Sequence, residues 1–270
     1  MPRSIRRCGE AHLLRVLVAR QLAYNERMCR MLAFASAEPK DVAPYLAHLA
    51  RFCESGNLVA RWEKHPGGNH PDGWGIAYRL GDEIRTVKSG KPAAGDPLLS
   101  DVRVLTDRFI GHVRFASNPE TVTAENSHPF AWKGIALAHN GTFCGKVGEE
   151  GDTRKVSDTL VFLELLAERW EERTLPGLAA ALRGILSDEG LVGKYSAANL
   201  LIATGERLFA FRRCRRDEGY YTLFVRGGSE AAAVASQPLD ERPGWRLMED
   251  GELLELSLPE PRSTRLPGLP

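Results

Sequence analysis

The sequence lacks paired cysteines, which argues against two classes of small protein. Its five cysteines are odd in number, stand far apart and form neither a CxxC nor a CxxH pattern. Disulfide-rich secreted domains and structural zinc sites depend on such pairs. We therefore expect free thiols in a cytoplasmic setting, with no metal and no cofactor.

The sequence also lacks an excess of charge and a long apolar run. Its 36 basic and 35 acidic residues leave a net charge of +1, which gives no general attraction to nucleic acid or to an anionic membrane. No stretch approaches the roughly 18 uncharged apolar residues that a membrane helix needs. The basic cluster at 212–216 precedes Tyr220 and Tyr221, and we interpret it as a solvated turn rather than a nucleic-acid patch. We expect neither a nucleic-acid nor a membrane partner.

What the sequence does contain is the pattern of one layered α+β domain. Hydrophobic residues make up 43% of its 270 residues and charged residues 26%, the profile of an ordinary globular protein. Apolar periodicity and capping residues predict helices at 41–54, 157–173 and 175–187, with Ser157 as an N-cap. Strand-like runs, including a hairpin around Gly205-Glu206, lie at 31–36, 74–80, 83–89, 108–115, 134–140, 198–205, 207–213, 220–227 and 231–236.

The first 28 residues differ in character from the rest. They contain six Arg and two Glu, and their apolar patch LLRVLVA is broken by Arg15, which makes it a poor signal-peptide core. We considered an over-long gene start, a removable leader and a surface helix. Because every candidate catalytic or binding residue lies at or after Met28-Cys29, we favour the over-long gene start. The predicted domains are an extension at 1–28, a catalytic domain at 29–257 and a Pro-rich tail at 258–270.

Four polar segments, three of which contain glycine, lie where predicted strands begin or end, at 70–75, 111–117, 126–130 and 138–143. Loops on a rigid scaffold often present binding groups, although each segment alone has a plainer explanation. Asn140-Gly141 is a common turn dipeptide, Arg114 suits a buried charge with a structural partner, and Asp72-Gly73 suits a turn. The spacing of His65 and His70 suggests a metal pair, but Pro66, Gly67 and Gly68 favour a loop.

The order of these segments is more specific than any one of them. The chain resembles the class-II glutamine amidotransferases, an N-terminal-nucleophile group that uses a cysteine, and it is most similar to the stand-alone type. The resemblance covers residues 28 to 257 and implies a four-layer αββα sandwich. It is carried by Met28-Cys29-Arg30, Asp72-Gly73-Trp74-Gly75, Gly111-His112-Val113-Arg114, Asn126-Ser127-His128-Pro129-Phe130, Ala138-His139-Asn140-Gly141, Ser157-Asp158-Thr159 and Ser236-Gln237-Pro238-Leu239 with Trp245.

Removal of Met28 would leave Cys29 with a thiol and a free α-amine on one residue. An α-amine has a reference pKa of about 7.7–8.0 and is a usable base near neutral pH, whereas a lysine at about 10.4 is mostly protonated. A preceding peptide bond would turn this amine into a non-basic amide. The chemistry therefore requires Cys29 at the N-terminus, where its thiolate attacks an amide and forms a thioester.

The resemblance also assigns the other site residues. Asn140 supplies its side-chain NH₂ and Gly141 its backbone N–H to the oxyanion. Arg114, with support from Ser117, binds the substrate α-carboxylate, and Asp158 pairs with the substrate ammonium. For His128, a substrate role and a hydrogen-bonded structural role are both open.

The expected reaction is hydrolysis of glutamine to glutamate and ammonia, with a small γ-glutamyl molecule as substrate. Alternatives are a hydrolase for a glutathione-like or other γ-glutamyl conjugate, and a silent scaffold or regulatory subunit. The chain departs from many relatives by Leu160 in place of a glutamate and by Phe115 in place of a tryptophan. Its length leaves no room for a synthase domain, so any ammonia acceptor would belong to a separate subunit.

Overall fold

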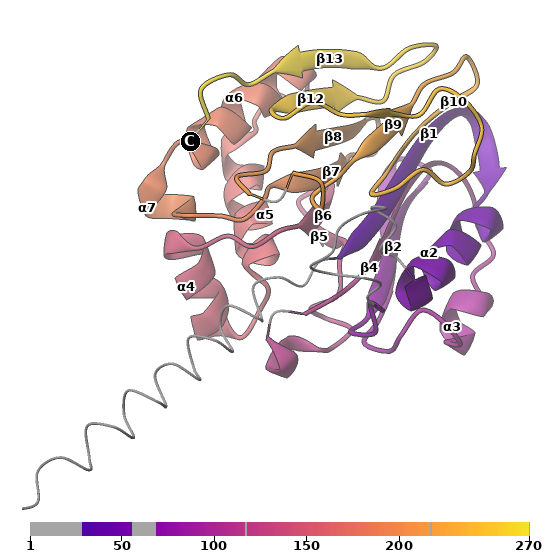
Figure 1. The fold of residues 1–270 in the computed structure, drawn as a ribbon, viewed down its shortest axis with the longest axis horizontal. Helices are drawn as coiled ribbons and strands as arrows, with labels where there is room; N and C mark the ends of the chain where they lie inside the picture. The colour runs from indigo at the N-terminus through magenta and orange to yellow at the C-terminus, as the bar shows by residue number, and fades with distance from the viewer. Residues whose placement is uncertain (1–28, 56–68, 117, 217, 270) are drawn as a thin grey trace, which may run out of the picture.

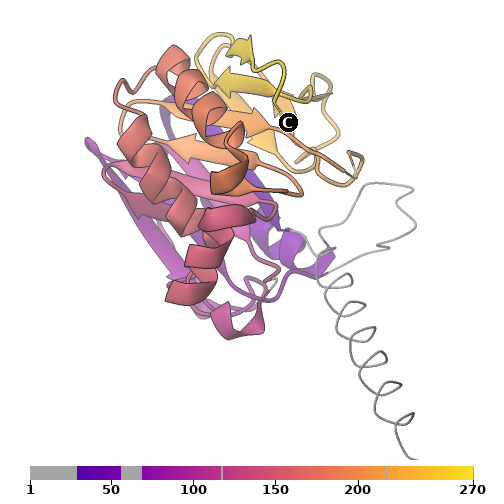
Figure 2. The same cartoon turned by 90° about the vertical axis from the view of Figure 1, so that its left-hand side faces the viewer.

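The computed structural model describes residues 29–55, 69–116, 118–216 and 218–269. Two antiparallel sheets lie face to face, with helices on both outer sides (Figure 1). Helices α2 (Ala43–Ser55) and α3 (Pro97–Ser100) cover one sheet. The other is covered by α4 (Gly145–Arg154), α5 (Asp158–Arg169) and α6 (Leu175–Leu186), with the short α7 (Glu189–Val192) beside them (Figure 2). The predicted four-layer αββα sandwich is confirmed.

The first sheet has seven strands, and β1 (Arg30–Asp41) lies at its centre. One neighbour is β10 (Ala231–Ala235) and the other is β4 (Leu105–Val113), both antiparallel to β1. The remaining strands are β2 (Trp74–Leu80), β3 (Glu83–Ser89), β9 (Phe224–Arg226) and β11 (Arg246–Leu247). Cys29 therefore stands directly before a strand that is hydrogen-bonded on both sides.

The second sheet has six strands in the order β13-β12-β8-β7-β6-β5. They are β5 (Phe130–Trp132), β6 (Ile135–Asn140), β7 (Asn199–Ala203), β8 (Leu208–Arg212), β12 (Glu252–Glu255) and β13 (Arg262–Arg265). Strand β13 pairs with β12, and Leu266 and Leu269 join the core under the helices. The ordered sheet thus extends beyond residue 257, where the predicted domain ended.

Side-chain alternation separates the space between the sheets from the space under the helices, because successive strand residues point to opposite faces. In β6, Ala136 and Ala138 belong to the cluster between the sheets, whereas Ile135 and Leu137 face the helices. In β7, the corresponding residues between the sheets are Leu201 and Ala203. By the same alternation, Asn140 and Asn199 face the space between the sheets.

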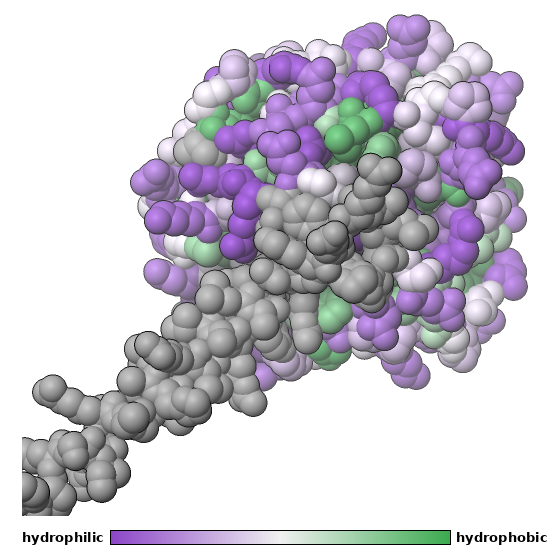
Figure 3. Space-filling model, viewed as in Figure 1, coloured by the Kyte–Doolittle hydropathy of each residue, from purple (hydrophilic) through white to green (hydrophobic). Residues whose placement is uncertain are grey.

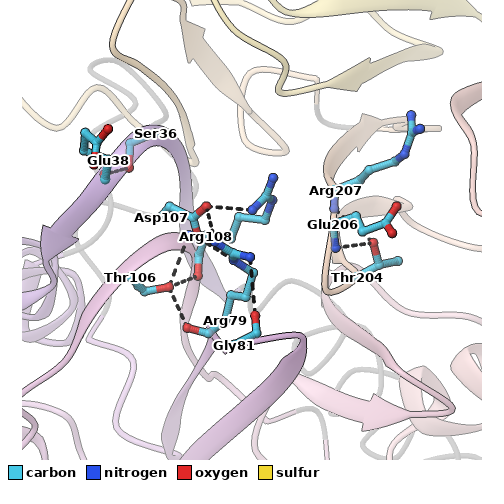
Figure 4. A network of polar contacts seen from close by, with 10 residues as sticks. All are labelled: Ser36, Glu38, Arg79, Gly81, Thr106, Asp107, Arg108, Thr204, Glu206 and Arg207. Carbon is cyan, nitrogen blue, oxygen red and sulfur yellow. Dashed lines mark hydrogen bonds and ion pairs between the residues drawn. The ribbon is translucent and has the colours of Figure 1, made fainter.

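A polar network lies on β2 and β4 at the end of the first sheet that is away from Cys29 (Figure 4). It surrounds Asp107, near the start of β4, whereas the opposite end of β4 pairs with Arg30. Asp107 accepts hydrogen bonds from Arg79 Nε at 2.7 Å and Arg79 Nη2 at 2.8 Å, and a further one from Arg108. Such two-point pairing fixes the relative position of β2 and β4.

Most predicted elements are present, and those that were missed are short or polar. Apolar periodicity correctly predicted helices α2, α5 and α6 and the long strands. Leu160 packs against the core under the helices, as expected. Helix α4 was missed because it buries little more than Val147 and Gly151 and so has no apolar repeat. The predicted solvated turn at 212–216 is wrong for Arg212, which ends β8 and donates to the carbonyl oxygens of Tyr221 and Met248.

Polar side chains predominate on the described part of the surface in Figure 3. The large apolar residues that are exposed lie on separate elements and are Leu80, Leu98, Leu105, Trp132 and Leu247. Within the described ranges, no helix combines the length and the apolar character that crossing a bilayer requires.

Candidate active site

Cys29 is buried at the entrance to β1, and its neighbours fix it closely. The backbone N–H of Phe115 donates to Sγ at 3.5 Å, and the thiol faces the Phe115 carbonyl oxygen at 3.8 Å. Two residues along, the Met31 N–H donates to Ser236 Oγ at 3.0 Å, while the Ser236 N–H donates to the Met31 carbonyl at 2.9 Å. The start of β1 is thus held between the segments that follow β4 and β10.

The surroundings of Cys29 keep its thiol protonated. Burial raises the pKa of Cys29 to about 11, although the Phe115 N–H and the positive charges of Arg114 and Arg30 oppose this rise. Arg30 is itself buried, donates to the Cys29 carbonyl at 3.2 Å and lies over the ring of Tyr220. A thiol with such a pKa needs a nearby base before it can act as a nucleophile at neutral pH.

Arg114 follows β4, and its guanidinium is buried. Burial lowers the pKa of Arg114, while electrostatic interactions with Cys29, Asp72 and Asp158 oppose this shift. Its guanidinium donates to the Thr121 carbonyl and, at 2.7 Å, to Thr121 Oγ1. Thr121 is the last residue of the short 3₁₀-helix η1 (Pro119–Thr121). Thr121 is therefore the structural partner that a buried Arg114 was expected to have. Its two contacts fix the orientation of the Arg114 guanidinium.

The loop before β2 is locked against the Arg114 segment. The Arg114 N–H donates to the Gly73 carbonyl at 2.8 Å, and Asp72 Oδ2 accepts the Ala116 N–H at 2.9 Å. Gly73 has φ +114°, and a Cβ there would lie 2.3 Å from Ser127 Oγ, so the turn requires glycine. Ser117, assigned by resemblance to carboxylate binding, lies outside the described residues.

Asn140 ends β6, and Gly141 leaves the strand with φ +148°. At Asn140, β6 pairs with β7, which lies far along the chain, so Asn140-Gly141 does not form the tight hairpin that the dipeptide alone favours. Asn140 is 1% exposed, and neither Nδ2 nor Oδ1 has a hydrogen-bond partner among the described residues. A buried carboxamide without a partner is costly, which makes Asn140 a candidate contact for a ligand.

Asp158 begins α5, with Ser157 as the predicted N-cap. Its Oδ2 accepts the Phe143 N–H at 2.7 Å, and its Oδ1 accepts the Thr159 N–H at 2.7 Å. The carboxylate therefore ties the loop after Gly141 to the helix. Oδ1 also accepts from Ser157 Oγ at 3.1 Å and from Thr159 Oγ1 at 3.3 Å, so it is fully used. Among the described residues Oδ2 accepts from Phe143 alone, and it is the oxygen that has capacity for a further donor.

His128 lies in a group of buried histidines. Its Nδ1 is 3.2 Å from the His139 carbonyl, and its Nε2 is 3.2 Å from Ser157 Oγ. Its ring centroid is 4.5 Å from that of His112. Burial lowers the pKa of His112 to about 3 and that of His128 well below its ordinary value, so both are neutral. This geometry fits the hydrogen-bonded structural role for His128.

The structure brings Cys29, Arg114 and Asp158 within electrostatic reach of one another. Two polar residues of this region were not predicted from the sequence. Thr121 holds Arg114, and Asn199 lies directly opposite Asn140 in the β6–β7 pair. In the described ranges, no three His, Cys, Asp or Glu side chains are arranged to hold a metal ion.

The family model for class-II glutamine amidotransferases matches residues 28–226. The Escherichia coli protein named "Putative glutamine amidotransferase YafJ" is 30% identical over 257 residues, covering 83% of this chain and 96% of that protein. The gamma-glutamyl-hercynylcysteine sulfoxide hydrolase of Mycolicibacterium smegmatis is 28% identical over 234 residues, covering 85% and 96% of the two chains.

Two solved structures share the fold. The glutamine phosphoribosylpyrophosphate amidotransferase of B. subtilis superposes with a TM-score of 0.57 at 21% identity over 88% of this chain, which spans about half (49%) of that enzyme. A class-II domain protein from Silicibacter pomeroyi gives a TM-score of 0.57 at 20% identity, covering 88% of this chain and 99% of that one. With the family match over most of its length, the chain belongs to the class-II glutamine amidotransferases.

Proposed function

We propose that the protein hydrolyses the γ-amide of glutamine to glutamate and ammonia through a thioester on Cys29. The observation that carries this proposal is the position of the Cys29 thiol, buried at the start of the central strand beside Arg114 and Asp158. A cation and an anion next to a nucleophile match the carboxylate and ammonium that flank the α-carbon of a γ-glutamyl group. Family membership supports the same reaction class.

The base in this proposal is the α-amine of Cys29 in a chain that begins at that residue. The neutral amine takes the thiol proton, Sγ attacks the amide carbon, and the ammonium returns the proton to the leaving nitrogen as the C–N bond breaks. A water molecule, deprotonated by the same amine, then hydrolyses the thioester. The high pKa of the buried thiol and its contacts with the Phe115 backbone are consistent with a base that belongs to the residue itself.

Negative charge on the attacked oxygen is stabilised by Asn140 and Gly141. The unpartnered carboxamide of Asn140 supports this role, since its NH₂ is buried and finds no acceptor in the described ranges. In this proposal Gly141 donates its backbone N–H to the same oxygen, and its φ of +148°, a conformation that favours glycine, supports the assignment. The loss of one such donor typically costs about 10²–10³ in rate.

Recognition of the γ-glutamyl end is assigned to Arg114 for the carboxylate and to Asp158 for the ammonium, with Ser117 as a further hydroxyl. His128 is proposed to hold Ser157, the residue before Asp158, through its contact with the Ser157 hydroxyl, rather than to touch the substrate. We also propose a cytoplasmic setting, which suits the free thiols of the protein.

A second candidate is hydrolysis of a larger γ-glutamyl conjugate, favoured by the relative named as a gamma-glutamyl-hercynylcysteine sulfoxide hydrolase. Arg114 and Asp158 would recognise the same end of either substrate, so they do not discriminate. Leu160 stands where many family members have a glutamate, and Phe115 stands where synthase-linked members often have a tryptophan. If ammonia is transferred, a separate acceptor or synthase subunit would be the partner.

The proposal is tested with a chain that starts at Met28, which retains every helix and strand described. Intact mass establishes whether Met28 is removed, and glutamate release is measured from glutamine and a panel of γ-glutamyl amides. The matched control carries one alanine inserted between Met28 and Cys29, which moves the amine away from the thiol.

We expect glutamate release from the chain that begins at Cys29, and none from the inserted control or from Cys29→Ala. Activity that survives Cys29→Ala would disprove the nucleophile assignment. A folded chain beginning at Cys29 that releases glutamate from no substrate of the panel would favour the silent scaffold. The intact mass of the protein from its native cells then shows which N-terminus is used.

A further inference from the structure

Asn199 and Asn140 form a buried pair of asparagines between the two sheets. They are directly opposite each other in the antiparallel register of β6 and β7, and both point toward the first sheet. Asn199 is fully buried and Asn140 is 1% exposed. The two carboxamides contribute four polar atoms, and within the part of the chain that the structure describes none of the four has a hydrogen-bond partner.

This lack of partners is unusual enough to require an explanation, since an unsatisfied buried polar group costs about 1–3 kcal/mol. Asn126, another buried asparagine, shows the ordinary situation. Its Nδ2 donates to the Lys155 carbonyl at 3.3 Å, and its Oδ1 accepts the Ser157 N–H at 2.9 Å. Two unsatisfied carboxamides that face each other therefore mark a place where bonds form when a ligand arrives.

The orientation of Asn140 matters for the proposed reaction. A carboxamide has an NH₂ side and an oxygen side of nearly equal size, so its shape does not decide which one faces the substrate. For its NH₂ to donate to the substrate oxygen, its Oδ1 must point elsewhere and needs a donor of its own. The side chain directly opposite belongs to Asn199, which carries an NH₂ group.

We propose that Asn199 is a positioning residue for the oxyanion donor. When substrate is bound, the Asn199 NH₂ donates to Asn140 Oδ1 and turns the Asn140 NH₂ toward the oxygen of the scissile amide. This inference rests on the proposed function of Asn140.

The backbone around Asn199 is well suited to this task. The preceding Ala198 N–H donates to the Arg213 carbonyl at 2.7 Å, and the Ala197 carbonyl faces His139 Nε2 at 3.0 Å. Leu200 pairs with His139 on one side and with Phe211 on the other. A side chain on such a rigid strand can hold its neighbour in one orientation.

The test is Asn199→Asp in the chain that begins at Cys29. The ionised aspartate has nearly the same shape, but it can only accept, so it attracts the Asn140 NH₂ away from the substrate. We expect kcat to fall by about 10²-fold, close to the loss of the donor itself, while KM and the Kd for glutamate stay within threefold. At lower pH a protonated Asp side chain can donate, so the ratio of variant to wild-type kcat should recover.

A merely structural role for Asn199 would lower thermal stability without this pH signature. Leu201→Val, on the same strand and face, is the matched control and should lose some stability at unchanged kcat. If the Asn199→Asp chain does not fold, Asn199→Ala replaces it, with kcat expected to fall about tenfold at unchanged KM.

A kcat within threefold of wild type in the folded Asn199→Asp or Asn199→Ala chain would overturn the inference. Failure of the proposed function looks different, because the wild-type chain beginning at Cys29 would then itself release no glutamate.

Discussion

Gly141→Ala offers the sharpest test of the oxyanion assignment, because the geometry around Gly141 leaves no space for a methyl group. A Cβ at this position would lie 2.0 Å from the Ala197 carbonyl oxygen and 2.7 Å from His139 Nε2. Real Cβ contacts essentially never fall under 3.0 Å. The Ala197 carbonyl cannot retreat easily, since Ala197 also pairs with Cys214.

The expected effect follows from the shift that this contact forces. To reach an allowed contact, the Gly141 backbone must move by about 1 Å, a misplacement that can cost about 10²-fold in rate. We therefore expect kcat to fall by about 10²-fold or more, approaching the loss of a whole oxyanion donor. The clash, together with a positive φ, should lower the free energy of unfolding by about 2–4 kcal/mol.

Gly134→Ala separates the cost of the backbone angle from that of the contact. Gly134 has φ +75°, but a Cβ there meets nothing within 4 Å. This control should lose about 1–2 kcal/mol and keep wild-type kcat. The assays are glutamate release for kcat and urea unfolding for stability. A folded Gly141→Ala chain with kcat within threefold of wild type would refute the assignment of the Gly141 N–H.

Three further predictions concern the rest of the molecule. Thr121→Val removes the hydroxyl that accepts from Arg114 at 2.7 Å, and steady-state kinetics should show KM for glutamine raised about tenfold with less change in kcat; an unchanged KM would contradict the role of Arg114. His112, with its pKa lowered to about 3, is neutral in the folded chain and protonated in the unfolded chain below pH about 6.5. The unfolded state therefore binds more protons, and urea unfolding should show stability falling as pH drops from about 6.5 toward 3, by up to about 1.4 kcal/mol per unit; His112→Gln should reduce this slope. Asp107→Asn weakens the pair with Arg79 at the far end of the sandwich and should lower stability by about 1–2 kcal/mol at unchanged kcat, so a large fall in kcat would show that the two ends are coupled.

The sequence predicts the elements of this fold better than their arrangement. Periodicity alone locates α5 and α6 because their apolar faces repeat at helical spacing. It does not show that β1 lies between β4 and β10, since these pairings join distant parts of the chain. The layered order comes from the resemblance carried by the motifs, and the sheet pairing then confirms it.

The candidate site likewise contains residues that the sequence predicts and residues that only the sheet pairing reveals. Each residue inside a recognisable motif, such as Cys29 or Asn140, can be proposed from the sequence. Asn199 cannot, because it lies in the apolar run ANLLIA and its neighbour Asn140 is known only from the register of β6 and β7. Asn199 stands two residues before Leu201 and so shares its face of the strand. This alternation is the one signal that would have placed a polar side chain between the sheets.

The central place of β1 also governs how the protein responds to mechanical force. A load applied along the strand at Cys29 must shear the ladders to β4 and β10 together, because β1 is bonded on both sides. A load at the other end first meets β13, an edge strand bonded to β12 alone. An unfolding machine that pulls the chain should therefore extract it more slowly from the Cys29 end than from the β13 end.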